Sequence, residues 1–379
     1  DKCNVPNLRF PEFSGEWEMS SIGEQFELYS GNTPSRMNKN QFDGSINWIT
    51  SGELKEHYIS DTKEKISEEA AKNNSLKLLP VGTFVIAIYG LEANGVRGTC
   101  SITTRESTIS QACMAFTSKM DIQNEFLYSW YKKHGNIIGI KYAQGTKQQN
   151  LSYDIIERFN ISYPCMEEQK KLIRFISLID QRIATQNKII EDLKKLKSAI
   201  SERLFNAIKG DVVVLEDIGD VVKGKQINGE FLSESGKYYV MNGGIEPSGF
   251  YNDYNVEANT ISISEGGNSC GYVQFNACPF WSGGHCYTIQ NTTDNVKTEY
   301  LYQFLKSKES EIMKLRIGSG LPNIQKKDLA KFKITIPNIS EQKVISAFLS
   351  SFERKADVEM NFVNLLLEEK QYLLRQMFI

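Results

Sequence analysis

The sequence predicts an α+β fold in which two mixed α/β domains are each followed by a long helix. Two observations support this prediction. A heptad pattern of apolar residues, typical of a long helix that packs on a partner helix, begins at Ile176. The same pattern begins again at Leu349, 173 residues later, with polar interruptions at the same two places. An internal repeat at a fixed offset indicates that the chain contains the same domain-and-helix unit twice.

The two heptad series define the long helices. The a and d positions of the first series are Ile176, Ile179, Ile183, Gln186, Ile190, Leu193, Lys197, Ile200 and Leu204. Those of the second are Leu349, Phe352, Ala356, Glu359, Val363, Leu366, Lys370, Leu373 and Met377. We therefore expect four segments: a first domain at 1–165, a first long helix at 166–209, a second domain at 210–338 and a second long helix at 339–379.

The polar positions predict how the helices pair. An antiparallel coiled coil with a pseudo-two-fold internal repeat places Lys197 against Glu359, and Gln186 against Lys370. A parallel pair would instead place Lys197 against Lys370, a costly like-charge contact in a partly buried seam. The alternative is that each helix packs only on its own domain.

Shorter elements of the two copies match in order. Strand-like runs broken by Gly and Asn occur in both copies, at 46–54, 82–90, 238–246 and 259–267. A helical run follows in each copy, at 125–133 and 299–308. Both long helices are entered through Glu-Gln-Lys, at 168–170 and 341–343, and Gly210 is a helix stop before the second copy.

Composition is that of a globular protein, with 40% hydrophobic and 24% charged residues and a net charge of −2. No apolar run approaches the ~18 residues of a membrane span, and the first residues lack a signal-peptide pattern. We expect a cytoplasmic protein, and Asp1 in place of Met suggests that a few leading residues are missing.

The search for metal and catalytic sites yields weak candidates. Seven cysteines without a CxxC pair favour reduced thiols, and His285 is expected at a packed strand end. The spacing of Cys270, Cys278, His285 and Cys286 fits no common zinc signature. Residues 219–225 satisfy GxxxxGK, but Gln226 stands where a phosphate loop needs Ser or Thr. We therefore expect no catalytic residue, no metal and no cofactor on this chain.

A DNA-binding interpretation has better support. The stretches between Glu125 and Asp154, and from Ile312 to Lys327, contain no acidic residue, and both combine basic residues with a Gly-rich loop and amide side chains. Lys and Arg neutralise phosphates, whereas Gln and Asn pair with adenine edges. Alternatively, both are solvated loops that merely lack acids. The candidate DNA contacts are Lys141, Gln144, Thr146, Lys147, Gln148, Gln149, Lys314, Arg316, Ser319 and Asn323, with second-rank candidates Tyr89, Arg97 and Asn268 in the turns at 89–97 and 265–268.

The order of these segments resembles the specificity subunit of type I restriction-modification enzymes over essentially the whole chain. The resemblance rests on NLRFPEFSGEW, on GNTPSR with INWITSGEL, and on YVMNGGIEPSGFY, ISISEGGNSCGYV and FWSGGHCYTI. It rests also on the P-x-x-x-E-Q-K entrance to each long helix, at 164–170 and 337–343.

The resemblance implies a non-catalytic recognition subunit. Each domain would be a target recognition domain that reads one half of a bipartite, asymmetric double-stranded DNA site. The helices would set the spacing, roughly 43 Å over the first heptad series at ~1.5 Å per residue. They would also dock two methylation subunits, with outward residues such as Arg174, Arg182 and Lys188 as candidates. S-adenosylmethionine, ATP and magnesium would belong to the partners, which methylate adenine N6 and, through the restriction subunits, cleave DNA. The rival interpretation is a structural adaptor that binds proteins through two repeated domains.

Overall fold

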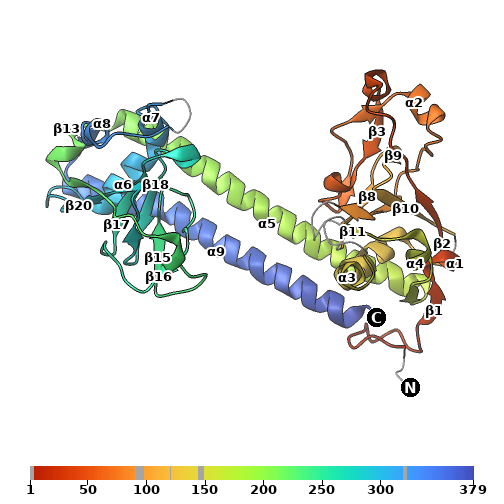
Figure 1. Cartoon of the computed structure of the whole chain (residues 1–379). Helices are drawn as coiled ribbons and strands as arrows, with labels where there is room; N and C mark the ends of the chain where they lie inside the picture. Colours follow the sequence, from red (N-terminus) through yellow and green to blue (C-terminus); the bar gives the residue numbers. More distant parts are fainter. Residues whose placement is uncertain (1–3, 91–97, 120, 144–148, 319–321) are drawn as a thin grey trace. The chain divides into compact units, whose positions relative to one another are not determined.

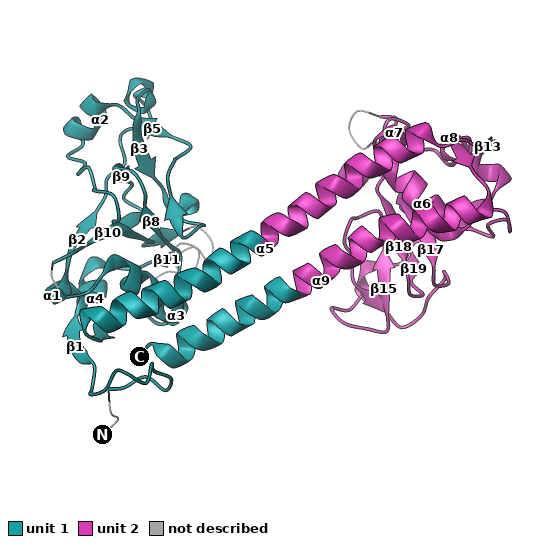
Figure 2. Ribbon diagram, turned by 180° about the vertical axis from the view of Figure 1, so that it is seen from behind, with its two compact units in different colours: residues 1–185, 362–379 teal, residues 186–361 magenta. Residues whose placement is uncertain are grey.

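The computed structural model describes residues 4–90, 98–119, 121–143, 149–318 and 322–379, and these form two compact units. Unit 1 comprises 1–185 and 362–379, and unit 2 comprises 186–361 (Figure 2). Each unit therefore holds one globular domain together with parts of both long helices, α5 (Met166–Ala207) and α9 (Ile339–Met377).

Unit 1 is built on a mixed five-stranded sheet of order β2-β10-β6-β8-β4, in which β4 pairs in parallel and the other strands antiparallel. A second sheet has the order β5-β3-β9, and β1 pairs with β12. The strands are β1 (Glu18–Ser21), β2 (Phe26–Ser30), β3 (Ile46–Ile49), β4 (Tyr58–Ile59), β5 (Lys65–Ile66), β6 (Phe84–Ala87), β7 (Tyr89–Gly90), β8 (Cys100–Thr103), β9 (Ser107–Ile109), β10 (Cys113–Ser118), β11 (Gln149–Asn150) and β12 (Asn160–Tyr163). The helices besides α5 are α1 (Ile22–Gln25), α2 (Glu68–Asn73), α3 (Asn124–Tyr142) and α4 (Tyr153–Glu157).

Unit 2 is built on an antiparallel sheet of order β14-β20-β17-β18, beside a three-stranded sheet β16-β15-β19 and the pair β13-β21 (Figure 1). Its strands are β13 (Asp211–Val214), β14 (Asp220–Lys223), β15 (Tyr238–Met241), β16 (Phe250–Tyr251), β17 (Thr260–Ser264), β18 (Val273–Asn276), β19 (Trp281–Ser282), β20 (Cys286–Gln290) and β21 (Lys333–Ile336). The helices are α6 (Thr298–Ser307), α7 (Glu309–Met313) and α8 (Lys326–Ala330), with α9.

Each domain has its main core between a sheet and one helix, with the long helices closing it. In unit 1, α3 packs on β8 and β6, and Leu172 of α5 and Phe378, just after α9, join the same core. In unit 2, α6 packs on β17 and β18, and Phe205 of α5 and Leu349 of α9 join that core. Because both long helices contribute to each core, neither helix belongs to one domain alone.

A buried glutamine explains the repeated entrance motif of the long helices. Gln169 Oε1 accepts from the backbone N–H of Gln123 (3.0 Å), and its Nε2 donates to the carbonyls of Asp121 and Pro164. Gln342 makes the equivalent bonds in unit 2, accepting from the N–H of Lys297 at 2.8 Å and donating to two carbonyls. Both side chains are fully buried. The glutamine therefore ties each long helix to the start of an earlier helix of the same domain, α3 for α5 and α6 for α9.

The N-terminal segment is fixed to the same motif. Arg9 donates from Nε and Nη2 to the two carboxylate oxygens of Glu168, at 2.8 and 2.7 Å. The Glu168 carboxylate, which is 1% exposed, raises the pKa of Arg9 above its ordinary value through this hydrogen-bonded pair. Such a bidentate pair satisfies a carboxylate that would otherwise be costly to bury.

The side-chain pairs predicted between the two long helices are wrong. Lys197 contacts Glu353 at 2.7 Å, not Glu359, and Lys370 contacts Asp180 at 2.5 Å, not Gln186. Gln186 instead donates to Glu359. The prediction considered only a and d positions facing each other. A lysine at an a position has a stem long enough to place its ammonium at the flank of the seam, where Glu353 and Asp180 occupy e positions.

These ion pairs follow the repeat. Glu353 lies 173 residues after Asp180, and Lys370 lies 173 residues after Lys197, so unit 1 and unit 2 contain the same pair at equivalent positions. Gln186 and Glu359, which contact each other, are also equivalent by the same offset. The internal repeat of the sequence is therefore repeated in the side-chain contacts.

The described cysteines are free: four are buried, and Cys165 and Cys278 are exposed. Within the described ranges no group of three or more His, Cys, Asp or Glu side chains is arranged to hold a metal ion. In the same ranges no helix is both long enough and apolar enough to cross a membrane.

Candidate nucleic-acid interface

In unit 1 the structure joins two loops that the sequence suggested separately. β7 and β11 pair antiparallel, with Tyr89 opposite Asn150 and Gly90 opposite Gln149. The pairing continues into the backbone bond from Leu151 N–H to the carbonyl of Ile88, at 2.8 Å. Tyr89–Gly90 and Gln149–Asn150 therefore form one edge.

Unit 2 contains the corresponding contact. Asn323, which lies 173 residues after Asn150, bridges to Gly266 and to Ile317, and the N–H of Gly267 donates to the carbonyl of Pro322 at 3.0 Å. The loop after β17 thus meets the loop before α8, as the loop after β6 meets the loop before α4 in unit 1. The repeat brings equivalent pairs of loops together in both domains.

The described candidate residues are accessible. Lys141 is exposed in the last turn of α3, and Lys314 and Arg316 are exposed just after α7. Asn268 and Asn323 are exposed on the joined loops, and Tyr89 is half-buried. The side chain of Gln149 is not described, and the remaining candidates lie outside the described residues: Arg97, Gln144, Thr146, Lys147, Gln148 and Ser319.

Sequence reasoning missed a cluster at the same edge of unit 2, and it misplaced His285. The side chain of His285 is 65% exposed, so the expectation of a packed strand end is wrong for the ring. Just before His285, glycines 283 and 284 form a turn, and the residue that begins the strand is the buried Cys286. The ring faces the carboxylate of Glu265, which also forms an ion pair with Lys223. The available signal was the pair of glycines directly before His285, which marks a turn rather than a packed strand.

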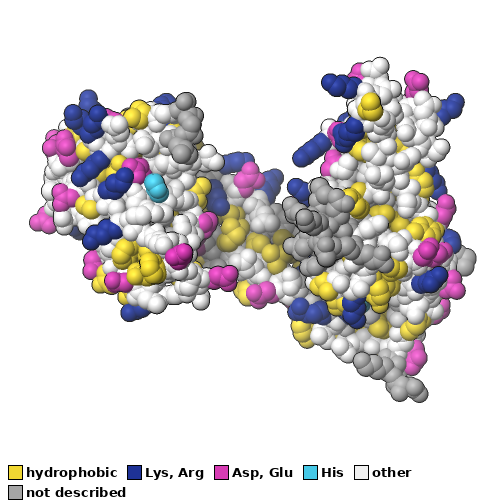
Figure 3. All heavy atoms as spheres, in the orientation of Figure 1, with side chains coloured by type: hydrophobic (Ala, Val, Ile, Leu, Met, Phe, Trp, Pro, Cys, Tyr) yellow, Lys and Arg dark blue, Asp and Glu magenta, His cyan; other side chains and the backbone are white. Residues whose placement is uncertain are grey.

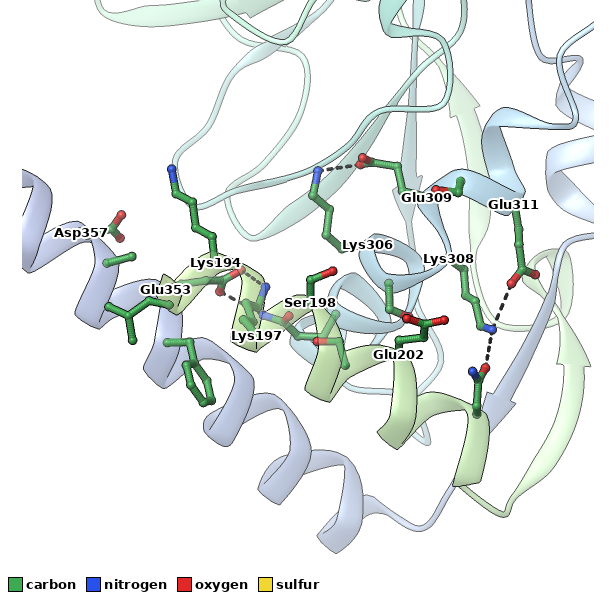
Figure 4. Close-up of a pocket in the computed structure, with 18 of the residues that line it drawn as sticks. Lys194, Lys197, Ser198, Glu202, Lys306, Lys308, Glu309, Glu311, Glu353 and Asp357 are labelled. Carbon is green, nitrogen blue, oxygen red and sulfur yellow. Dashed lines mark hydrogen bonds and ion pairs between the residues drawn. The ribbon is translucent and has the colours of Figure 1, made fainter. Parts of the chain in front are cut away.

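The charge distribution is mixed rather than uniformly basic. On the face in Figure 3, Lys and Arg side chains stand among Asp and Glu side chains in both units. A cleft of about 780 Å³ in unit 2, lined by α5, α6, α7 and α9, shows the same character. Several of its lysines are paired within the cleft, Lys197 with Glu353, Lys306 with Glu309, and Lys308 with Glu311 (Figure 4). Because these charges satisfy one another, the cleft is a less suitable anion site than the exposed loops.

Arg182, a candidate for partner docking, makes an internal contact in unit 1. Its guanidinium lies 5.5 Å from the centre of the Phe362 ring, and Asp180 beside it pairs with Lys370. Side chains on this part of α5 therefore contact α9 and are not all available to a partner protein.

Two domains on paired long helices, with matching loop edges, define a duplicated DNA-specificity protein. The family profile described as "Type I restriction modification DNA specificity domain" matches residues 14–195 and again 209–366. The chain belongs to this family and carries its domain twice.

Relatives and solved structures agree with this assignment. The type I restriction enzyme MjaIX specificity subunit of Methanocaldococcus jannaschii is 26% identical over 364 residues, covering 85% of this chain and 83% of that protein. The EcoR124I/EcoR124II specificity subunit of Escherichia coli is 28% identical over 192 residues, covering 50% and 46%. The crystal structure of an S subunit from M. genitalium has the same fold, with a TM-score of 0.61, 19% identity and 99% of both chains covered.

Proposed function

We propose that this chain is the non-catalytic DNA-recognition subunit of a type I restriction-modification complex, with each domain reading one half of a bipartite, asymmetric site. The observation that carries the proposal is the equivalent loop edge in both repeats, at Tyr89–Asn150 and at Gly266–Asn323. Lys141 in one copy, and Lys314 with Arg316 in the other, are exposed cations that precede Asn150 and Asn323 in the chain. Two equivalent reading edges that differ in sequence suit a site whose halves differ.

The long helices serve as the spacer, an antiparallel coiled coil with a pseudo-two-fold repeat. Support comes from the equivalent ion pairs Lys197–Glu353 and Lys370–Asp180, and from the contact between Gln186 and its own equivalent Glu359. A heptad series of roughly 43 Å at ~1.5 Å per residue exceeds one DNA turn of ~34 Å. Such a spacer can hold two reading edges over separate major grooves.

The outer face of α9 supports docking of partner helices. In unit 2, Val344 and Val358 are two heptads apart and are 69 and 60% exposed. In unit 1, Leu365 and Tyr372 are one heptad apart and are 62 and 53% exposed. Exposed apolar residues with heptad spacing are what a further helix packs against. We assign this face to the methylation subunits, two of which accompany the chain.

Restriction subunits complete the complex, in the cytoplasm. In this proposal the chain only recognises DNA, so S-adenosylmethionine, ATP and magnesium bind to the partner subunits.

Methylome sequencing tests the proposal. Cells that express this chain with its methylation partner should show N6-methyladenine in a split motif with a fixed gap, and the motif should vanish without this chain. Binding of that DNA should fall steeply with salt. The double variant Lys314→Gln with Arg316→Gln should reduce the slope of log K against log salt by about 1 for each phosphate that is no longer neutralised. Absence of a split motif refutes the proposal, and salt-independent binding of protein alone would favour the rival adaptor.

A further inference from the structure

Three strand ends in unit 2 place a lysine, a glutamate and a histidine side by side. Lys223 ends β14, Glu265 follows β17, and His285 precedes β20, and these strands are neighbours in the order β14-β20-β17. The backbone N–H of Glu265 donates to the carbonyl of His285 at 2.9 Å. The cluster therefore sits on a hydrogen-bonded sheet and not on a free loop.

The cluster is continuous with the loop edge described above. The N–H of Ile324 donates to the carbonyl of Glu265 at 2.8 Å, and the next residue, Gly266, bridges to Asn323. The hydroxyl of Tyr287 lies 3.1 Å from both Glu265 Oε1 and the carbonyl of Ile324. Any DNA that reaches Asn323 thus lies next to this cluster.

Glu265 is buried, but only one of its carboxylate oxygens is satisfied. The residue is 9% exposed, and Oε1 accepts from Lys223 Nζ at 2.7 Å and lies within reach of Tyr287. Oε2 is buried and has no hydrogen-bond partner among the described residues, and Nδ1 of His285 lies 3.8 Å from it. A buried carboxylate with an unused acceptor is costly unless a further donor completes it.

Lys223 and His285, in contrast, face solvent. The side chain of Lys223 is 51% exposed, and its ammonium uses one of three donors on Glu265. The carboxylate fixes the end of a flexible side chain that would otherwise lose rotamer entropy on binding. Glu265 therefore holds the Lys223 ammonium in place, and the other two N–H donors of that ammonium are directed toward solvent.

The net charge of the cluster favours contact with a neutral base edge over contact with a phosphate. Lys223 and Glu265 cancel, and a carboxylate 2.7 Å from the ammonium repels an approaching phosphate. A base edge is neutral and presents acceptors and donors together. In the major groove guanine offers O6 and N7 as adjacent acceptors, which lysine contacts.

We propose, on the basis of the proposed function, that Lys223 and His285 read a G·C pair in the half-site of the second domain, and that Glu265 is their positioning residue. Movement of the exposed His285 ring toward Glu265 Oε2 lets Nδ1–H supply the missing donor when DNA is bound. The other ring nitrogen is then an acceptor, so Lys223 donates to the guanine and His285 accepts from the N4 amino group of the paired cytosine. Asn268 and Asn323 flank this contact.

The test uses the full chain in complex with its methylation subunits and the split motif found by methylome sequencing. Duplexes carrying every single base-pair change in both halves are measured against wild type, Lys223→Gln, His285→Gln and Glu265→Gln. The matched controls are Lys306→Gln and Glu309→Gln, which disrupt a similar ion pair of 2.6 Å in the same unit. Thermal unfolding of each variant checks that it folds, and Lys223→Gln, at a half-exposed position, keeps the test decisive if Glu265→Gln unfolds.

We expect Lys223→Gln and Glu265→Gln to lose about tenfold of discrimination at one G·C pair in one half only, with the other half unchanged, because a good base contact is worth roughly that much. His285→Gln should affect the same pair. A loss that is uniform across sequences, with a shallower salt dependence, would identify a phosphate contact and overturn the inference. Unchanged discrimination, or changes equal to those of the controls, also overturns it. If wild type binds no split motif, the proposed function itself fails.

Discussion

The contact between Lys197 and Glu353 provides a quantitative test of how the long helices pair in unit 2. The ammonium lies 2.7 Å from Glu353 Oε1, and the side chains are 17% and 32% exposed. The same carboxylate accepts from Gln303 Nε2 at 3.0 Å and Tyr302 OH at 3.3 Å. Lys197→Met should therefore leave a partly buried carboxylate without its cation, and Glu353→Gln should leave the ammonium without its anion.

The magnitude lies between two known limits. Exposed ion pairs contribute about 0–1 kcal/mol, whereas breaking a buried pair costs about 3–5 kcal/mol. For the partly exposed Lys197–Glu353 pair we expect each single variant to lose about 2 kcal/mol and the coupling energy to be about 1–1.5 kcal/mol. For a unit of this size, 1 kcal/mol shifts Tm by about 2–4 °C, so the effect is measurable.

The assay is a double-mutant cycle read by thermal and urea unfolding of the full chain. A second cycle between Lys197 and Glu359 serves as the control, because the two residues are not in contact and should be additive within about 0.5 kcal/mol. If Lys197 couples more strongly to Glu359 than to Glu353, the helices pair in the register that the heptads alone predicted, and the structural reasoning is refuted.

Three further predictions concern docking, pH and packing. Val358→Asp should abolish co-elution with the methylation subunit at little cost to stability, whereas Val212→Asp, at a similarly exposed valine, should leave assembly intact (60 and 64% exposed). Burial lowers the pKa of His134 to about 4, so unit 1 should lose up to about 3 kcal/mol as pH falls from 6.5 to 4, and His134→Gln should remove that part of the pH dependence. Gly135→Ala should destabilise unit 1 by about 1–3 kcal/mol, because its Cβ would lie 2.6 Å from the backbone of a neighbouring loop, whereas Gly52→Ala, with open space, should be neutral.

Each of these has a contrary result. Equal loss of assembly in both valine variants would mean that any surface charge disrupts the complex. For His134, the sign follows from protonation: the unfolded chain binds the proton near pH 6.5 and the folded chain only near pH 4, so stability is full above 6.5 and declines below it. An identical pH profile in wild type and His134→Gln would refute this assignment. A neutral Gly135→Ala would show that α3 can move away from the loop.

The repeat and the two long helices could be predicted from the sequence. Heptad spacing is a local property of one segment, and an offset of 173 residues is visible without any structure. The P-x-x-x-E-Q-K motif was also visible, but its role was not. Only the structure shows Gln169 and Gln342 buried between helices, because their partners are backbone groups of residues about 45 positions away.

The register of the long helices and the cluster of Lys223, Glu265 and His285 were decided by tertiary structure. Lys197 contacts Glu353 at an e position, whereas the prediction considered only a and d positions. The length of the lysine side chain and the partial burial of Glu353 determine this contact. Lys223, Glu265 and His285 come from three strands whose adjacency depends on sheet order, and strand order is set by long-range pairing rather than by local pattern. Periodic, local features were therefore determined by the sequence alone, whereas the contacts that set the helix register and form this cluster depend on which distant segments the fold brings together.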